Sequence, residues 1–280
     1  MAHNGLRSGV GTVMNRRRAL SLMGGSLAAA AGGCFPRVED IRPKALWNRI
    51  GGSTPNDMLL RTMLVERSAG DAYLNRDLWT GAARPLAHEL STLLAHNGFR
   101  VGVCSGVLTG EFERLMHAEA SVVDPKERTF HAGQARVIPI HGPIADMPCK
   151  VLADLAADPA SRNYTALECG LNLTATPVHT DRVKLLCEPQ VQYGDKELSL
   201  APSADNTQLT RRERKPLEAF NTLTFDVTLG PDDYLLFGPT EDPTDRLGLA
   251  YFRPDGAKQR VLIVRALRPE GIVKPEAMKG

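Results

Sequence analysis

Hydrophobic and polar residues alternate along several segments in the second half of the chain. Within 183–191, and again within 223–229, apolar side chains fall on one side and mainly polar or charged side chains on the other. A period of two is typical of a strand with one buried face. We therefore predict a mostly antiparallel sheet with one wet face, covered by a helix at 147–158, with strands at 129–140, 171–178, 183–191, 223–229, 234–237 and 260–266.

The same alternation assigns individual side chains to a core. We expect Leu185, Phe225, Val227 and Ile263 to point into one core that these strands share. Thr228 falls on the opposite, wetted face.

The region before residue 125 has a different period. After Pro85, leucines recur at the spacing of one helix face until Gly98, and a second pattern of this kind covers 112–120. A segment at 58–67 that suits a strand precedes the first helix, and an alternating segment at 99–103 precedes the second. The predicted order is therefore strand, helix, strand, helix.

These patterns predict an α+β fold class with two folded parts. A small βαβα unit at 57–125 is followed by a mostly antiparallel β domain at 128–269. Residues 35–56, which contain three prolines and no sustained period, are predicted to be a tether, and 270–280 a tail.

Two polar segments are predicted to be connections. Segment 71–79 combines polar groups with Tyr73 and Trp79, and we expect it to plug the space between the two domains; the alternative is the wall of a ligand pocket. Segment 201–217 contains a run of basic residues at 211–215 and is predicted to be a solvated, mobile loop, with a docking patch for an acidic partner as the alternative.

Composition and charge narrow the possible function classes. With 42% hydrophobic residues and 24% charged residues, the 280-residue chain is neither a disordered polymer nor a polytopic membrane protein. Residues 1–33 contain four arginines and no acid, which leaves 30 Lys and Arg against 32 Asp and Glu in the remainder. Because this body is weakly acidic and poor in aromatic residues, we expect no nucleic-acid partner.

The basic start of the chain predicts export. Arg16, Arg17 and Arg18 precede Leu20 and a short uncharged stretch that ends in small residues near 31. A basic head, a short apolar middle and a small-residue end are typical of a secretory signal, which we place at 1–34. The paired arginines resemble a twin-arginine export signal, which implies transport in the folded state to the periplasmic side.

The end of this signal resembles a bacterial lipobox. Ala31, Gly32 and Gly33 lead directly to Cys34. The resemblance implies that Cys34 becomes the lipid-modified N-terminus after cleavage and anchors the protein to a membrane. Cleavage after an Ala-x-Ala within 28–31 and an uncleaved N-terminal anchor are the alternatives.

The order of strands and turns near the C-terminus also resembles a known family. The segments that carry this likeness are 170–178 running into 183–189, then 224–238, and finally 247–248 leading to 260–269. Over about residues 165–269 they resemble a degenerate C-terminal module of the secretins, the ring-forming outer-membrane channels of bacterial secretion systems. The resemblance implies a β domain that works through protein contacts in the envelope. Pro239 stands where the family has the second glycine of a pair.

The remaining cysteines suggest no metal or redox motif. Cys104, Cys149, Cys169 and Cys187 form no Cys-x-x-Cys pair. They can form two disulfides in any of three pairings, or remain buried free thiols. Cys104 follows a predicted strand, a position that nucleophiles use, but we interpret it as a structural thiol.

Histidines and acids give no catalytic motif either. His88 and Glu89 begin a zinc-protease pattern, but Thr92 occupies the place of its second histidine. A site that joins distant residues, such as His131 with His141 or Asp232, stays open. The acids at 232–233 and 241–245 are expected to order turns, with a weak calcium site as the alternative.

The sequence therefore predicts an exported, lipid-anchored envelope protein that is not an enzyme and has no catalytic, cofactor-binding or metal-binding residue. Its expected partners are other envelope proteins or further copies of itself. The alternative is a periplasmic hydrolase or metal-dependent enzyme that is exported folded.

Overall fold

The computed structural model describes residues 57–106, 109–179, 181–202 and 209–267, which all belong to one compact unit. The predicted export signal, tether and tail at 1–34, 35–56 and 270–280 lie outside these residues. Among the described residues, no helix is both long and apolar enough to cross a membrane.

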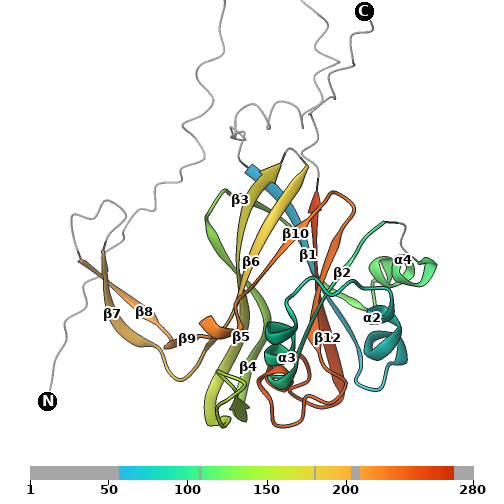
Figure 1. Cartoon of the computed structure of the whole chain (residues 1–280). Coiled ribbons are helices and arrows are strands. Elements are labelled where there is room, and N and C mark those ends of the chain that lie inside the picture. Colours follow the sequence, from blue (N-terminus) through green and yellow to red (C-terminus); the bar gives the residue numbers. More distant parts are fainter. Residues whose placement is uncertain (1–56, 107–108, 180, 203–208, 268–280) are drawn as a thin grey trace, which may run out of the picture. The chain divides into compact units, whose positions relative to one another are not determined.

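The larger part of the unit consists of two antiparallel sheets (Figure 1). Sheet A has the strand order β2-β11-β12-β1-β3. Its strands are β1 (Asp57–Ser68), β2 (Phe99–Cys104), β3 (Val122–His131), β11 (Tyr234–Pro239) and β12 (Lys258–Leu267).

Sheet B has the order β10-β6-β5-β4, with a short strand β9 that also pairs with β6. These strands are β4 (Ala135–Val151), β5 (Ala160–His179), β6 (Arg182–Gln192), β9 (Leu217–Ala219) and β10 (Phe225–Leu229). Strands β7 (Glu197–Pro202) and β8 (Leu209–Arg214) pair with each other in a separate two-stranded sheet.

The main core contains the inner faces of both sheets. Leu60 and Leu262 of sheet A belong to the same buried cluster as Leu171 and Leu185 of sheet B. Two helices, α3 (His88–His96) and α5 (Leu247–Phe252), add side chains to this cluster. The Tyr251 hydroxyl of α5 donates to the carbonyl oxygens of Gly170 at 3.2 Å and Gln190 at 2.7 Å, which joins α5 to sheet B.

The outer face of sheet A forms a second, smaller core with short helices. The π-helical turn η3 (Tyr73–Asp77), α2 (Leu78–Thr80) and α4 (Gly110–His117) provide Leu74, Leu78, Phe112 and Leu115. These pack with Met63, Val65, Leu236, Val261 and Ile263 of the sheet. Over part of its length, sheet A is therefore buried on both faces.

The predicted α+β class with mostly antiparallel strands is confirmed. The predicted helix after Pro85 corresponds to α3, and Gly98 follows it with a φ of 82°, a conformation that favours glycine. The helix predicted at 112–120 corresponds to α4.

The division into two domains at residue 125 is wrong. Strands β1 and β2, from the first predicted domain, lie in the same sheet as β11 and β12 from the second. The buried side chain of Asn97 also crosses this boundary: its Nδ2 donates to the Leu152 carbonyl at 2.8 Å, and its Oδ1 accepts from the Leu152 amide at 2.9 Å. The two segments therefore fold as one unit.

The helix predicted at 147–158 is also wrong. Residues 147–151 continue strand β4 and pair with the first residues of β5. Met147, Cys149 and Val151 are buried, while Pro148 and Lys150 between them are exposed. This alternation has the period of a strand and not the 3.6-residue period of a helix.

One of the four predicted core residues faces the wrong way. Leu185, Phe225 and Val227 lie in the core between the sheets, as predicted. Ile263 lies instead in the cluster on the outer face of sheet A. Residues 261–264 are all apolar and buried, because this part of β12 is covered on both faces. The sequence of these four residues therefore does not show which of them face sheet B.

Three connecting segments differ from prediction. Segment 201–217 is not simply a mobile loop, because β8 and the end of β7 pair within it. Segment 71–79 is helical and packs on the outer face of sheet A rather than between domains. The strand predicted at 129–140 is the end of β3, a turn at Gly133 with a φ of 75°, and the start of β4.

The packing predicts a difference in stability between the two faces of β10. Phe225 is 1% exposed, and Phe225→Ala should lower the free energy of unfolding by about 3 to 5 kcal/mol because it leaves a cavity between the sheets. Thr228 on the same strand is exposed, and Thr228→Ala should change it by less than about 0.5 kcal/mol. Denaturant unfolding monitored by circular dichroism measures both, and equal losses would contradict the assignment of the two faces.

A candidate binding groove on the outer face of sheet A

The helices cover only one end of the outer face of sheet A. Along β12, Val261 and Ile263 pack in the cluster with the helices, and Arg265 is the next residue on that face. Along β1, Met63 lies at the border of this cluster, and Arg61 is the next residue on the face. The face thus changes from apolar to charged at the point where the helical cover ends.

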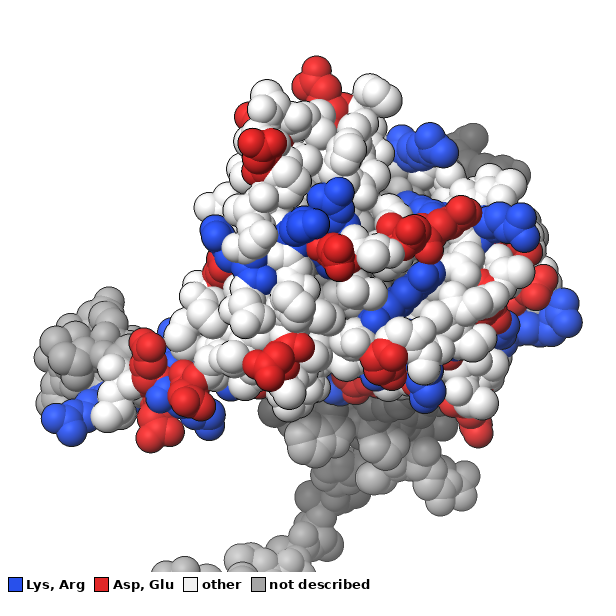
Figure 2. All heavy atoms as spheres, turned by 90° about the horizontal axis from the view of Figure 1, so that it is seen from below, with Lys and Arg blue, Asp and Glu red and all other residues white. Residues whose placement is uncertain are grey.

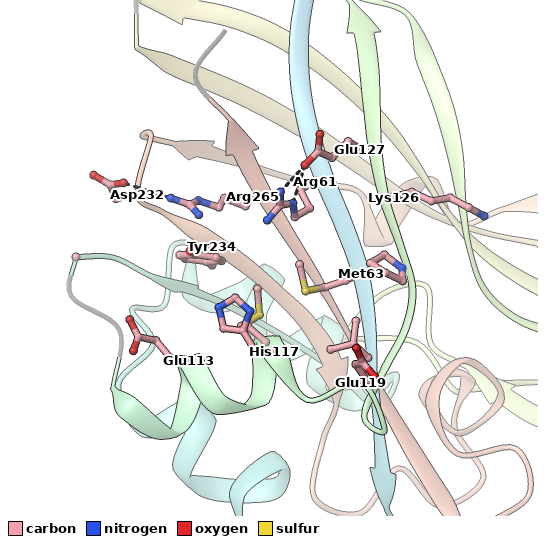
Figure 3. A pocket seen from close by; sticks show the side chains of 14 residues that line it. Arg61, Met63, Glu113, His117, Glu119, Lys126, Glu127, Asp232, Tyr234 and Arg265 are labelled. Carbon is pink, nitrogen blue, oxygen red and sulfur yellow. Dashed lines mark hydrogen bonds and ion pairs between the residues drawn. The ribbon is translucent and has the colours of Figure 1, made fainter. Parts of the chain in front are cut away.

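A groove of about 910 Å³ opens at this border (Figure 3). We call it the arginine groove; its lining includes Arg61, Met63, His117, Asp232, Tyr234 and Arg265. Residues of β1, β3, β11 and β12 form one wall, and residues of α4 and of the turn after it form the other.

Helix α4 is held against the sheet by its cap and by aromatic packing. The Thr109 hydroxyl accepts a hydrogen bond from the Phe112 amide at 3.3 Å and so caps the first turn. The Phe112 ring meets the Tyr234 ring edge to face, with 5.3 Å between the centroids. Tyr234 is therefore fixed between α4 and the sheet, and it connects the two walls of the groove.

The strand register brings the charged residues into one row. Tyr234 of β11 lies opposite Arg265 of β12, Arg265 lies opposite Arg61 of β1, and Arg61 lies opposite Glu127 of β3. Two like charges that face each other across adjacent strands destabilise a sheet unless other charges compensate them. The Arg61–Arg265 pair therefore requires compensation.

Two carboxylates supply part of this compensation. Arg61 forms an ion pair with Glu127, in which Nε donates to Oε1 at 3.1 Å. Arg265 Nη2 lies 3.5 Å from Asp232 Oδ1, and the guanidinium carbon lies 5.0 Å from the centroid of the Tyr234 ring. Arg265 Nε is buried and has no hydrogen-bond partner. Arg265 thus retains an unused donor.

The opposite wall carries two acidic groups. Glu113 comes from α4 and Glu119 from the turn that follows, and His117 of α4 also lines this wall. Figure 3 shows Glu113 and His117 on the α4 side of the groove, across from Arg265. The groove is therefore basic along the centre of the sheet wall and acidic along the helix wall.

Charges on the face shown in Figure 2 are mixed in sign. Basic and acidic side chains are interspersed there, and neither sign forms a continuous patch. That face presents no extended basic surface of the kind that tracks a nucleic-acid backbone.

The four described cysteines, Cys104, Cys149, Cys169 and Cys187, are free thiols. Burial raises the pKa of Cys104, and it raises the pKa of Cys149 to about 11. Burial also raises the pKa of the fully buried Cys187 and of Cys169. A thiol with a raised pKa stays protonated and is a poor nucleophile, which agrees with a structural role for Cys104.

The candidate histidines are dispersed. His88 and His96 begin and end α3, and His131 Nδ1 lies 2.7 Å from Asp57 Oδ1. His141 lies at an irregularity of β4. Within the described part of the chain, no group of three or more His, Cys, Asp or Glu side chains is placed to hold a metal ion.

The acidic segments order turns, as expected. Asp233 Oδ2 accepts from the Gly230 amide at 2.7 Å, and Asp242 Oδ1 accepts from the Thr244 amide at 3.2 Å. Asp232, in contrast, lies in the groove beside Arg265.

Trp79 has both a structural contact and a place in a cavity. Its Nε1 donates to the Leu74 carbonyl at 2.8 Å, and the Arg100 guanidinium lies 4.9 Å from the centroid of its ring. It also lines a smaller cavity of about 380 Å³.

The arginine groove was not predicted, although the sequence contains a signal for it. Arg61 interrupts the apolar run of 58–65, and Arg265 interrupts that of 261–267. In a strand whose other residues are apolar, a single charged residue indicates the position at which the layer that covers the strand ends. Cys34 and the export-signal residues Arg16, Arg17, Arg18 and Leu20 lie outside the described residues.

Comparison with known proteins gives only distant likenesses, all of them to solved structures. No protein-family model matches the sequence, and no curated protein matches it significantly. Among solved structures, the chain is similar to the InvG secretin domain β-barrel from the Salmonella SPI-1 injectisome NC-base, with 8% sequence identity and a TM-score of 0.20. The match covers 79% of this chain and 63% of that chain. InvG is thus a weak structural neighbour that fits the secretin-like interpretation of 165–269 only loosely.

The raised thiol pKa values predict slow labelling in the native state. In a chain that carries Cys34→Ala, we expect no rapid reaction with Ellman's reagent at about pH 8, because the described thiols are protonated there and three of the four are buried. All four should react once the chain is unfolded in guanidinium chloride. A thiol that reacts rapidly in the folded protein would contradict the structural role of these cysteines.

Proposed function

We propose that this protein is a non-enzymatic, exported and lipid-anchored protein of the cell envelope, and that the arginine groove binds a partner protein. The observation that supports binding is the Arg61–Arg265 pair, placed side by side on two central strands and open to a groove. Binding groups carried by strands are held more precisely than groups carried by loops.

The charged groups of the groove suit recognition. Arginine stays ionised at all physiological pH values and offers a planar fork of donors that matches a carboxylate. Arg265 is also oriented by the Tyr234 ring beneath it. Such fixed donors can select a partner by charge and geometry. Recognition of this kind involves no proton transfer.

The place of action is inferred from the start of the sequence. Residues 16–18 resemble a twin-arginine signal, and Cys34 follows a lipobox-like segment. The chain between Cys34 and the first described strand could span up to about 75 Å if fully extended. An anchored protein could therefore present its groove to partners well away from the membrane surface.

The secretin resemblance at 165–269 supports the bacterial secretion machinery as the setting of this protein. The alternative is a periplasmic hydrolase or a metal-dependent enzyme, because the twin-arginine route often exports folded, cofactor-loaded proteins. Stoichiometric metal in the purified full chain would favour this alternative over a binding role.

Anchoring predicts a specific mass and a specific loss. In a bacterial host, intact-mass analysis of the membrane fraction should show a chain that begins at Cys34 and carries a diacyl or triacyl adduct, and Cys34→Ala should remove the adduct. A soluble chain that starts near Ala31 or Phe35 would contradict the lipid anchor.

A binding role predicts site-specific crosslinking in cells. A photoreactive residue in place of His117, which is exposed on the helix wall of the groove, should give one discrete crosslinked product. The same residue in place of Thr228, exposed on sheet B, is the matched control and should give none.

The product should disappear when Arg61→Gln and Arg265→Gln are combined, because both donors of the sheet wall are then lost. Its mass distinguishes an envelope protein from a second copy of the chain. Crosslinking of equal yield from both positions, or from neither, would contradict the proposed binding surface.

A further inference from the structure

We infer that the arginine groove takes an acidic peptide segment, and that Glu127 and Asp232 occupy its two arginines until carboxylates of the ligand replace them. This inference rests on the proposed function, because it names the chemistry of the partner that the groove binds.

The first support is the arrangement of the two guanidinium groups. Arg61 and Arg265 lie directly opposite each other on β1 and β12, so their positive charges repel. A nearby negative charge therefore stabilises both. Their internal partners come from opposite sides, Glu127 on β3 and Asp232 before β11. In the row of described strands, Arg61 and Arg265 are direct neighbours, with Glu127 beyond Arg61 and Tyr234 beyond Arg265. A carboxylate that enters the groove between the two guanidinium groups would therefore be shared by both.

The internal partners are easily replaced. The side chain of Asp232 is 70% exposed and that of Glu127 is 48% exposed. Ion pairs with so much access to water contribute little to stability and exchange readily with other charges. The contact of Asp232 with Arg265 is also long, at 3.5 Å.

Arg265 has a donor that no described group uses. Its Nε is buried and has no hydrogen-bond partner, and Asp232 Oδ1 lies 3.5 Å from Nη2. A carboxylate that binds side-on can accept from Nε and one Nη together, which is the stronger, bidentate arrangement. The ring of Tyr234 at 5.0 Å holds the guanidinium in place for this contact.

The other wall favours a peptide over a polyanion. Glu113 and Glu119 line the helix side, and their charge would repel a ligand that is negative along its whole length. Met63 and Met116 add apolar surface between the walls. A peptide can match this pattern by placing acidic side chains toward the arginines and apolar side chains against the methionines.

The test uses a defined probe on the purified full chain. The probe is a fluorescent peptide in which glutamate and leucine alternate, and the matched control peptide has glutamine in place of each glutamate. Fluorescence anisotropy should show binding of the acidic peptide and at least about tenfold weaker binding of the control, because charge-assisted hydrogen bonds are lost.

Variants of the groove give the sharper result. Arg265→Gln and Arg61→Gln should each weaken binding by about tenfold or more. Glu127→Gln and Asp232→Asn should strengthen it severalfold, because each removes an internal competitor. The matched control is Lys184→Gln, which removes a cross-strand ion pair with Asp226 that is also exposed to water. This variant should leave affinity unchanged. Unfolding midpoints establish that each variant is folded.

Four outcomes would overturn the inference, and the last of them separates it from the proposed function. One is weaker binding in Glu127→Gln and Asp232→Asn, because these carboxylates would then position the arginines rather than compete for them. Another is unchanged binding in a folded Arg265→Gln variant, and the third is equal binding of inorganic phosphate and peptide, which would show an unselective anion site. If the peptide fails to bind but the crosslink from position 117 persists, this inference is wrong and the proposed binding role stands.

Discussion

The pairing of β1 with β12 is the constraint on which the rest of the structure depends. It joins residues 57–68 to residues 258–267, in register from Leu59 opposite Leu267 to Ser68 opposite Lys258. These two strands form the centre of sheet A, and both buried clusters include side chains of its faces. Sheet B covers the inner face, and α2, η3 and α4 cover part of the outer face. The core therefore forms only when segments far apart in the chain meet.

The groove follows from a mismatch of length between this sheet and its cover. Along β12, the residues that alternate toward the outer face are Val261, Ile263 and Arg265, and the apolar cluster includes only the first two. The strand continues where the short helices stop, so its next outward residue meets water and can be charged. Since β1 makes the same change at Arg61, two arginines meet at the border. Charge placement and helix length together create the candidate site.

The sequence predicts the local elements well because they leave local patterns. The alternation in 183–191 and 223–229 and the leucine spacing after Pro85 correspond to real strands and a real helix. Pairing between distant segments leaves no such pattern, so one unit was predicted as two domains. Burial on both faces also removes the alternation of β12, and Ile263 was placed on the wrong side for that reason. The groove was missed because Arg61, Arg265 and Glu127 become neighbours only through strand register.

The central claim is that an acidic partner occupies the arginine groove between α4 and sheet A. Hydrogen–deuterium exchange of the full chain, with and without the acidic peptide, measures this occupation directly. The account predicts slower exchange in α4 and the turn after it, residues 110–121, and in the turn at 230–233 that carries Asp232, with little change in β7 and β8. Unchanged exchange in both regions at a saturating peptide concentration, or protection confined to β7 and β8, would contradict it.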